Sequence, residues 1–474
     1  MTRTLTSIAV AAYAVAALAY ACHGLDTNPQ YDNQGLTYAS DMIEDARDGR
    51  LWHFLMQERK YPMAHVLPFA AVEEVLLVWK DGITKRESFV IGRAVAMLFS
   101  LGMFLALWRI AKRLDARREA TLLLMASVLV LLFTSAIRPH VPTAFWTLMA
   151  LLCSIRYREA PSALRALAAF ACAGVAFATL QSGLLAFAFP LWALLERPWS
   201  ARSVAKAGCW ALGTAAVAAA VGYPFVLRPL FGRVAQGGAD LGHDVGLTFD
   251  VVGAPAHWIP QLVGGEIVLL AAAGIAVVSM VRRKDYAAPW IPVVLAYCAL
   301  FFLVFGFHSI AAGRFFIPVL PMFALLAAPW LRSAKPAATA GIAILVVLMA
   351  AKLAWLSFVP NTYQDTSAFF ATRDGKVGTV SQPGYFFSIA PDKRVTETDS
   401  LADVGTIVVP DYDRADTAKM SKWTPCFRSV ASRTTDEIAL LWNDTPWALW
   451  TLFEASRMGP NMTVYCKEGP VSQG

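Results

Sequence analysis

Long apolar runs recur along most of the chain and are separated by short polar turns. A membrane-spanning α-helix needs about 20 apolar residues, and about eleven runs reach or approach that length. Their approximate positions are 5–23, 89–111, 119–137, 141–156, 165–181, 183–196, 205–226, 264–281, 288–307, 315–331 and 338–357. This pattern predicts a polytopic α-helical membrane protein.

Longer polar segments at 24–88, at 227–263 and from 359 onward interrupt this pattern. In the first, apolar residues recur at helical spacing from Leu36 to Ala46. The stretch from Met63 to Trp79 is apolar on one side, and we place Glu73 and Glu74 on its other side. Both stretches predict helices that lie in the membrane interface without crossing it.

The C-terminal segment changes to short alternating runs typical of strands. We expect strands at 376–380, 406–410, 437–442 and 462–466, and helices at 365–372 and 446–458. The chain is therefore predicted to contain a membrane module, 1–358, with its first outer loop at 24–88, and a small α/β domain, 359–474. Cys426 and Cys466 are the only cysteines of that domain, and outside the cytoplasm they would form a disulfide.

Composition supports a membrane protein, because 57% of the 474 residues are hydrophobic and only 16% are charged, against about a quarter in soluble domains. The net charge of +7 does not indicate nucleic-acid binding, since the basic residues gather in alternate turns. By the positive-inside rule these turns are cytoplasmic. We therefore expect a multi-pass inner (cytoplasmic) membrane protein whose C-terminal domain and active site face the periplasm, the extracytoplasmic side.

The first outer loop contains the leading catalytic candidate, Asp32, about ten residues after the first span. A carboxylate beside a membrane helix is costly if it enters lipid, so it is expected to face water or a cavity. The alternative is structural, because Asp32 also precedes a predicted helix and would serve as its N-cap.

Two basic pairs lie in the turns that are otherwise almost free of charge. Arg138 and His140 form the first pair, and His308 and Arg314 form the second. An arginine in a turn that the positive-inside rule places outside the cytoplasm needs an anionic partner, such as a phosphate or carboxylate. Snorkelling toward lipid headgroups is the alternative for Arg138.

A third group, Asp240, His243 and Asp244, lies in a Gly-rich segment and contains residue types that bind divalent cations. The alternative is a solvated turn. The chain has no phosphate-binding Gly-rich loop of the Gly-x-x-x-x-Gly-Lys type, no Gly-x-Ser-x-Gly nucleophile turn and no His-Glu-x-x-His zinc motif.

The order of these features resembles the GT-C superfamily of integral-membrane glycosyltransferases, including the bacterial aminoarabinose transferase to lipid A and relatives of the protein O-mannosyltransferases. The resemblance covers about 1–358. The residues that support it are Tyr31-Asp32, Tyr61-Pro62, the stretch from Gly174 to Gln181, and Arg314-Phe315 followed by Pro318 and Pro321. Two positions depart from the family pattern: Asn33 replaces its second acid, and Gln181 replaces its usual lysine.

The resemblance implies transfer of a sugar, with inversion, from a polyprenyl-phosphate donor to an acceptor hydroxyl on a glycan, lipid or protein. Asp32 would be the general base. The expected substrate-binding residues are Tyr31, Tyr61, Arg138, His140, Gln181, Arg228, His308 and Arg314. No cofactor is fixed by these residues, and a divalent cation is compatible with them. The expected partners include the bilayer and exclude nucleic acid.

Three alternatives compete with this interpretation. The first is a transporter or flippase of lipid-linked saccharides, which would usually contain internal repeats with broken helices in matching halves, and we find none in the sequence. The second is an O-antigen polymerase or ligase, whose largest loop would come late in the chain. The third is a polyprenyl-dependent oligosaccharyltransferase, which would need an acidic metal site.

Overall fold

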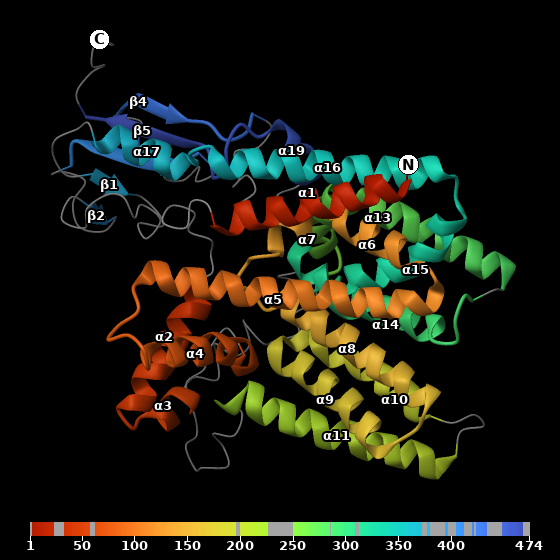
Figure 1. The fold of residues 1–474 in the computed structure, drawn as a ribbon. Coiled ribbons are helices and arrows are strands. Elements are labelled where there is room, and N and C mark those ends of the chain that lie inside the picture. Colours follow the sequence, from red (N-terminus) through yellow and green to blue (C-terminus); the bar gives the residue numbers. More distant parts are fainter. Residues whose placement is uncertain are drawn as a thin grey trace.

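A computed structural model describes most of the chain, as a helical bundle with a small C-terminal sheet (Figure 1). The described residues are 2–22, 33–56, 62–195, 200–225, 250–284, 286–308, 312–371, 377–379, 394–396, 404–411, 420, 423–433 and 448–467. The predicted strand at 437–442 lies outside them.

The bundle is built from the apolar runs that the sequence predicts to be helical. Its helices are α1 (Thr2–Cys22), α5 (Lys85–Ala111), η1 (Lys112–Leu114), α6 (Arg117–Met125), α7 (Val128–Phe133), α8 (His140–Glu159), α9 (Ala163–Thr179), η2 (Gln181–Phe187), α10 (Ala188–Leu194), α11 (Ala201–Gly222), α13 (Gly253–Arg283), α14 (Ile291–Phe305), η4 (Gly313–Val319), α15 (Leu320–Ser333) and α16 (Pro336–Phe358).

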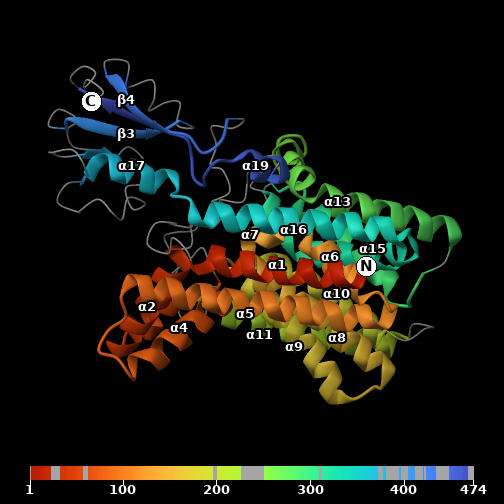
Figure 2. The same ribbon diagram turned by 45° about the horizontal axis from the view of Figure 1, so that its top comes forward.

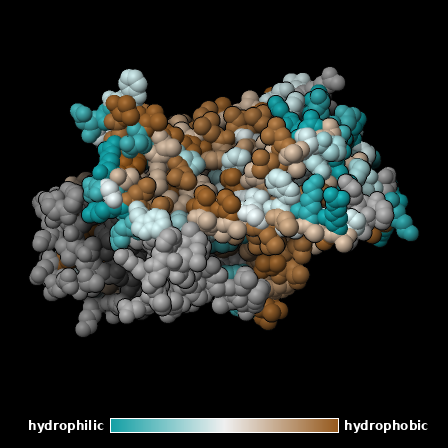
Figure 3. Space-filling view, turned by 90° about the horizontal axis from the view of Figure 1, so that it is seen from below, coloured by the Kyte–Doolittle hydropathy of each residue, from teal (hydrophilic) through white to brown (hydrophobic). Residues whose placement is uncertain are grey.

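Six of the described helices or helix pairs are long and apolar enough to cross a membrane: Thr4–Cys22, Glu87–Leu114, Ala201–Gly222, Gly253–Arg283, Gly313–Ser333 and Pro336–Ala371. Three shorter apolar helices are Ala163–Thr179, Gln181–Leu194 and Ile291–Phe305. The count of eleven crossings therefore stays a prediction. Large apolar side chains such as Leu98 and Leu212 are mostly exposed, and Figure 3 shows a broad hydrophobic band between more hydrophilic ends.

Three predicted spans are not single α-helices. The run 119–137 is divided into α6 and α7, because the Ser127 hydroxyl accepts a hydrogen bond from the amide of Val130 and begins a new helix there. The runs 183–196 and 315–331 begin as the 3-10 helices η2 and η4 before they continue as α10 and α15. Gly183 permits the close approach of η2 to α9, since a Cβ there would lie 2.1 Å from the Ala176 carbonyl oxygen.

The helices alternate in direction, so the connecting turns fall at two ends of the bundle. One end contains the basic turns after η1, α8, α13 and α15, and we call it the basic end. The other end contains α2 (Asn33–Arg47), α3 (Leu51–Met56) and α4 (Met63–Leu77), and we call it the loop end. Figure 1 shows these three helices and the sheet at the same end of the bundle.

The helices α2 and α4 confirm the predicted helical stretches of the first outer loop. The prediction for Glu73 was wrong, because its side chain is buried, while Glu74 is exposed and forms a salt bridge with Arg47. Glu73 accepts hydrogen bonds from the hydroxyls of Ser88 and Ser40, and so connects α4 to α5 and α2. Burial raises the pKa of Glu73, and these hydrogen bonds oppose the rise.

The C-terminal part contains α17 (Thr362–Ala371), α19 (Ala448–Glu454) and a five-stranded sheet in the order β2-β1-β3-β5-β4. Its strands are β1 (Val377–Thr379), β2 (Arg394–Thr396), β3 (Thr406–Pro410), β4 (Thr424–Ser429) and β5 (Met462–Cys466). Strand β1 is parallel to β2 and β3, whereas β5 is antiparallel to β3 and β4. The predicted Cys426–Cys466 disulfide is present and joins β4 to β5.

Successive residues of β3 pack into different cores, as expected for a strand covered on both faces. Val408 belongs to the core that continues into the helical bundle, whereas Ile407 and Val409 form a separate cluster with Tyr465. Helix α19 contacts α13 and α16, and α17 lies along β4 and β5 (Figure 2). The sheet is thereby held against the loop end of the bundle.

Candidate functional site

The predicted residues that the structure describes lie in the turns at the loop end. Arg138 lies between α7 and α8, and His140 is the first residue of α8. Gln181 begins η2, and Arg314 is the second residue of η4. His308 follows α14 by three residues. All five therefore lie at the end of the bundle opposite the basic turns.

Arg138 and His140 are the two buried members of this set that lie at the start of α8. The amide of Arg138 donates to the carbonyl of Ala136 over 2.8 Å, in a tight turn that leads into α8. The His140 ring meets Phe133 and Phe315 edge to face, with centroid distances of 5.7 and 5.4 Å. These aromatic contacts fix the plane of the imidazole. Its Nδ1 atom is buried and has no hydrogen-bond partner among the residues that the structure describes.

Arg314 is placed beside His140 by a short 3-10 helix. The amide of Gly313 donates to Gln261 Oε1 of α13 over 2.5 Å, which anchors the start of η4. A side chain at Gly313 would clash, because its Cβ would lie 2.9 Å from the Cβ of Gln261. The Arg314 guanidinium lies 5.2 Å from the centroid of the Phe315 ring. Arg314 is half-buried, so its charge lies at the border between the bundle and its surroundings.

A further histidine, His65 of α4, completes this cluster. Its ring is buried and packs edge to face on Phe69 at 5.2 Å. Burial and, to a smaller extent, the positive charge of Arg138 lower the pKa of His65 to about 3, while a hydrogen bond with the Ile137 backbone opposes the shift. His65 is therefore neutral at pH 7. Arg314, Arg138 and His65 all lie close enough to His140 to act on its ring electrostatically.

We call these four residues, His65, Arg138, His140 and Arg314, the cationic cluster. They come from three separate parts of the chain, namely α4, the turn into α8 together with its first residue, and η4. Guanidinium groups bind phosphate oxygens through charge-assisted hydrogen bonds, so a phosphate is the class of ligand that these side chains suit.

Arg93 is a second buried cation near the loop end. It belongs to α5 and is 1% exposed, and its Nη1 donates to the carbonyl of Ala21 over 2.9 Å. Ala21 is the penultimate residue of α1, whose last carbonyls otherwise have no partners within the helix. Arg93 therefore fixes the end of α1, from which the segment containing Asp32 departs.

Glu266 is a buried carboxylate within α13, where the backbone departs from helical geometry (φ −122°, ψ 16°). Its Oε1 accepts a hydrogen bond from the amide of Leu129 over 3.0 Å, at the start of α7. Negative charge is stabilised at a helix N-terminus. Glu266 thus supports the break between α6 and α7.

Sequence reasoning missed His65, Arg93 and Glu266. A signal was present for the last two, since each is an ionisable residue inside an apolar run, where such residues are costly. His65 gave no comparable signal, because its importance comes from a distant turn that packs against it.

Several predicted site residues lie outside the described residues: Tyr31, Asp32, Tyr61, Arg228, Asp240, His243 and Asp244. Among the residues that the structure does describe, no group of three or more His, Cys, Asp or Glu side chains is arranged to hold a metal ion.

Comparisons with known proteins identify the architecture. No protein-family model matches the sequence, and no curated protein matches it. The crystal structure of ArnT from Cupriavidus metallidurans, bound to undecaprenyl phosphate, matches with a TM-score of 0.58 and 12% identity, over 100% of both chains. The arabinofuranosyltransferase AftD from Mycobacteria gives a TM-score of 0.47 and 15% identity, over 100% of this chain and 42% of that one. The match to ArnT over the whole chain shows that the two proteins share a fold, as the resemblance seen in the sequence led us to expect.

Proposed function

We propose that this protein is a membrane glycosyltransferase that moves a sugar from a polyprenyl-phosphate donor to an acceptor hydroxyl. The observation that carries the proposal is the cationic cluster at the loop end of a GT-C-like fold. Arg138 and Arg314 would bind the donor phosphate, and His140 would donate a hydrogen bond to it through its otherwise unpartnered Nδ1.

The chemistry of this transfer explains why cations are needed. The acceptor oxygen forms a bond to the anomeric carbon, while the bond from that carbon to the phosphate oxygen breaks. The bonding electrons leave with the polyprenyl phosphate, whose negative charge increases. Fixed guanidinium groups stabilise this developing charge. The acceptor's proton passes to a carboxylate, for which Asp32 is the proposed general base. Attack opposite to the leaving group inverts the anomeric centre.

An apolar cavity near the cluster supports a lipid-linked donor. It has a volume of about 780 Å³ and lies between α2, α3, α4 and the end of α11. Met63, Leu67 and Ala70 of α4 line it, together with Val221 of α11. His65 is on the same helix. One helix would thus contact both the prenyl chain and the cluster that binds its phosphate.

The distribution of basic turns supports transfer on the extracytoplasmic side. These turns gather at the end opposite the cationic cluster, and by the positive-inside rule that end is cytoplasmic. The cluster and the C-terminal sheet would then face the periplasm. The acceptor, whether a glycan, a lipid or a protein, would approach from that side.

A donor panel tests the proposal. Purified protein in nanodiscs is incubated with several polyprenyl-phosphate sugars and a mixture of candidate acceptors, and released polyprenyl phosphate is measured. We expect release with one donor, and loss of that release in the Arg138→Gln/Arg314→Gln double variant. If the double variant binds and consumes that donor as well as the original protein does, the cluster is not the donor site.

A further inference from the structure

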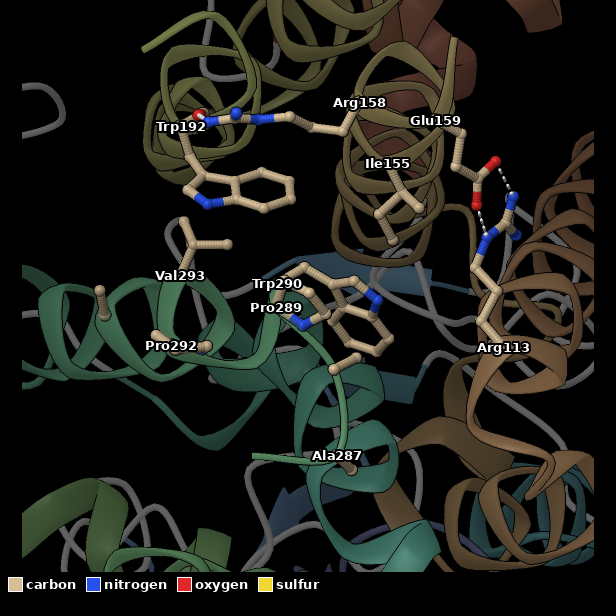
Figure 4. A pocket seen from close by; sticks show the side chains of 12 residues that line it. Arg113, Ile155, Arg158, Glu159, Trp192, Ala287, Pro289, Trp290, Pro292 and Val293 are labelled. Atoms are coloured by element: carbon tan, nitrogen blue, oxygen red, sulfur yellow. Dashed lines mark hydrogen bonds and ion pairs between the residues drawn. The ribbon is translucent and has the colours of Figure 1, made fainter. Parts of the chain in front are cut away.

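A second cavity lies at the basic end of the bundle, remote from the cationic cluster (Figure 4). Its volume is about 930 Å³, and its walls come from the ends of α8 and α10, the start of α14 and η1. Helix α8 separates the two places, because His140 is its first residue and Glu159 its last. At 1.5 Å per residue, that separation is about 30 Å. The cavity is therefore independent of the proposed donor site.

One wall of this cavity is basic. Arg158 donates from Nη2 to the carbonyls of Trp192 and Leu195, over 2.7 and 2.6 Å, and its guanidinium lies 5.3 Å from the Trp192 ring centroid. Both hydrogen bonds use the same nitrogen, so Nε and Nη1 are not engaged by them. The two carbonyls and the ring thus hold this cation at the cavity while it keeps donors for a further partner.

The neighbouring charges leave an excess of positive charge at the cavity. Arg113 forms a two-pronged salt bridge with Glu159, with distances of 2.7 and 3.0 Å. Arg156 and Arg165 also act electrostatically on the Glu159 carboxylate. The single negative charge of Glu159 therefore has three arginines as neighbours, and Arg158 adds a further positive charge. An anion entering the cavity would therefore be attracted.

The rest of the lining is apolar and aromatic. It contains Trp192, Trp290, Ile155 and Val293, and Figure 4 shows the Trp192 ring between Arg158 and Val293. Tryptophan is enriched where a membrane protein passes from hydrocarbon to headgroups, because its ring is apolar and carries one polar N–H. A ligand that fills this cavity must combine an anionic group with hydrocarbon.

We propose that this cavity binds an anionic glycerophospholipid from the leaflet at the basic end. Its phosphate lies against Arg158, and an acyl chain lies against Trp192, Trp290 and Val293. The excess of positive charge selects an anionic lipid over a zwitterionic one. A lipid seated between α8, α10 and α14 would bridge helices at the end of the bundle that has no role in the proposed transfer.

Native mass spectrometry provides the test. The protein is reconstituted in nanodiscs of phosphatidylcholine with phosphatidylglycerol, released, and examined for retained lipid. The variants are Arg158→Gln and, as a matched control, Arg202→Gln, which removes an exposed arginine from the start of α11 at the same end but away from the cavity. We expect the original protein and Arg202→Gln to retain one phosphatidylglycerol. Arg158→Gln should retain it at least about tenfold less, as expected when a hydrogen bond to a charged group is lost.

A cavity-filling variant separates lipid binding from folding. Val293→Trp would occupy the space while leaving every basic residue in place, and it should also lose the retained lipid. If Arg158→Gln does not fold, this variant alone decides the matter. Unchanged retention in Val293→Trp, or an equal decrease in Arg158→Gln and Arg202→Gln, would overturn the proposal. Three other results would also overturn it: equal retention of phosphatidylcholine, displacement of the lipid by soluble glycerol phosphate, or preferential binding of polyprenyl phosphate.

Discussion

Replacement of Arg314 by glutamine offers the most direct test of the cationic cluster. Arg314 is half-buried in η4, beside His140 and over the Phe315 ring. The hydrogen bond from the Gly313 amide to Gln261 anchors the start of η4 and so positions Arg314. Glutamine retains a polar side chain, although a shorter one, and removes the charge. The substitution therefore removes the electrostatic contact with a donor phosphate without opening a large void.

The expected magnitude follows from the type of bond that is lost. A hydrogen bond to a charged group contributes about 1.5–3 kcal/mol, which corresponds to about 10- to 150-fold in donor affinity. Arg138 also acts on His140, so both arginines would bind one phosphate and their effects would be coupled. The change for the double variant should therefore differ from the sum of the single changes by about 0.5 kcal/mol or more.

Donor binding is measured by titration of a polyprenyl-phosphate sugar into protein in nanodiscs, alongside thermal unfolding. Arg332→Gln is the matched control, because Arg332 lies near the other end of α15 and pairs with Asp115 at the basic end. It removes one charge from the same helical unit. Exposed charges that lie more than about 10 Å from a ligand are largely screened by physiological salt, so this control should bind donor normally.

Two results would contradict this reasoning. The first is unchanged donor affinity in a folded Arg314→Gln protein, which would remove Arg314 from the phosphate site and leave Arg138 as the main candidate. The second is an equal loss of affinity in Arg332→Gln, which would mean that net charge alone controls binding. A loss of affinity that is accompanied by unfolding would be repeated with Arg314→Lys, which keeps the charge.

Three further substitutions test other parts of the site. Asp32→Asn should bind donor but react about 100-fold more slowly in single-turnover assays, because it cannot accept a proton, and near-normal turnover would leave Asp32 as a helix cap. The pKa of His65 is about 3 in the folded protein and about 6.5 in the unfolded chain. Between these pH values the unfolded chain binds one more proton than the folded protein. The free energy of unfolding therefore falls as pH is lowered from about 6.5 to about 3. His65→Phe should reduce this loss, which approaches about 1.4 kcal/mol per pH unit, whereas exposed His53→Gln should not, and identical pH–melting curves would refute the assignment. Glu266→Ala should lower the free energy of unfolding by about 1–3 kcal/mol, because the buried amide of Leu129 loses its acceptor. Glu266→Gln should retain most of that stability. Equal losses in the two variants would contradict this account.

Much of the helical architecture was predictable because it depends on local composition. The ends of α1, α11 and α16 lie within a few residues of the predicted limits, since a run of apolar residues in lipid must satisfy its backbone hydrogen bonds within one helix. The break between α6 and α7 was not predictable in the same way. Besides the local Ser127 cap, it involves Glu266, which accepts a hydrogen bond from the Leu129 amide 137 residues away in the sequence.

The site was partly predictable. Arg138 and Arg314 stood out because each is an arginine in a turn that is otherwise almost without charge. That both act on His140, and that His65 joins them, required the packing of α4 and η4 around the start of α8. The inward orientation of Glu73 was likewise decided by Ser88 and Ser40, which surround it with hydroxyl donors.

The sequence by itself determined that the chain is a multi-helix membrane protein with a basic and a non-basic set of turns, a small C-terminal sheet and one disulfide. Hydrophobicity, charge and cysteine placement are properties of short segments, so they can be recognised without knowledge of contacts. Only the tertiary structure decided which polar residues meet at the loop end and which line the cavity between Arg158 and Trp290. Those groups come from helices far apart in sequence, and their meeting depends on how the helices pack against one another.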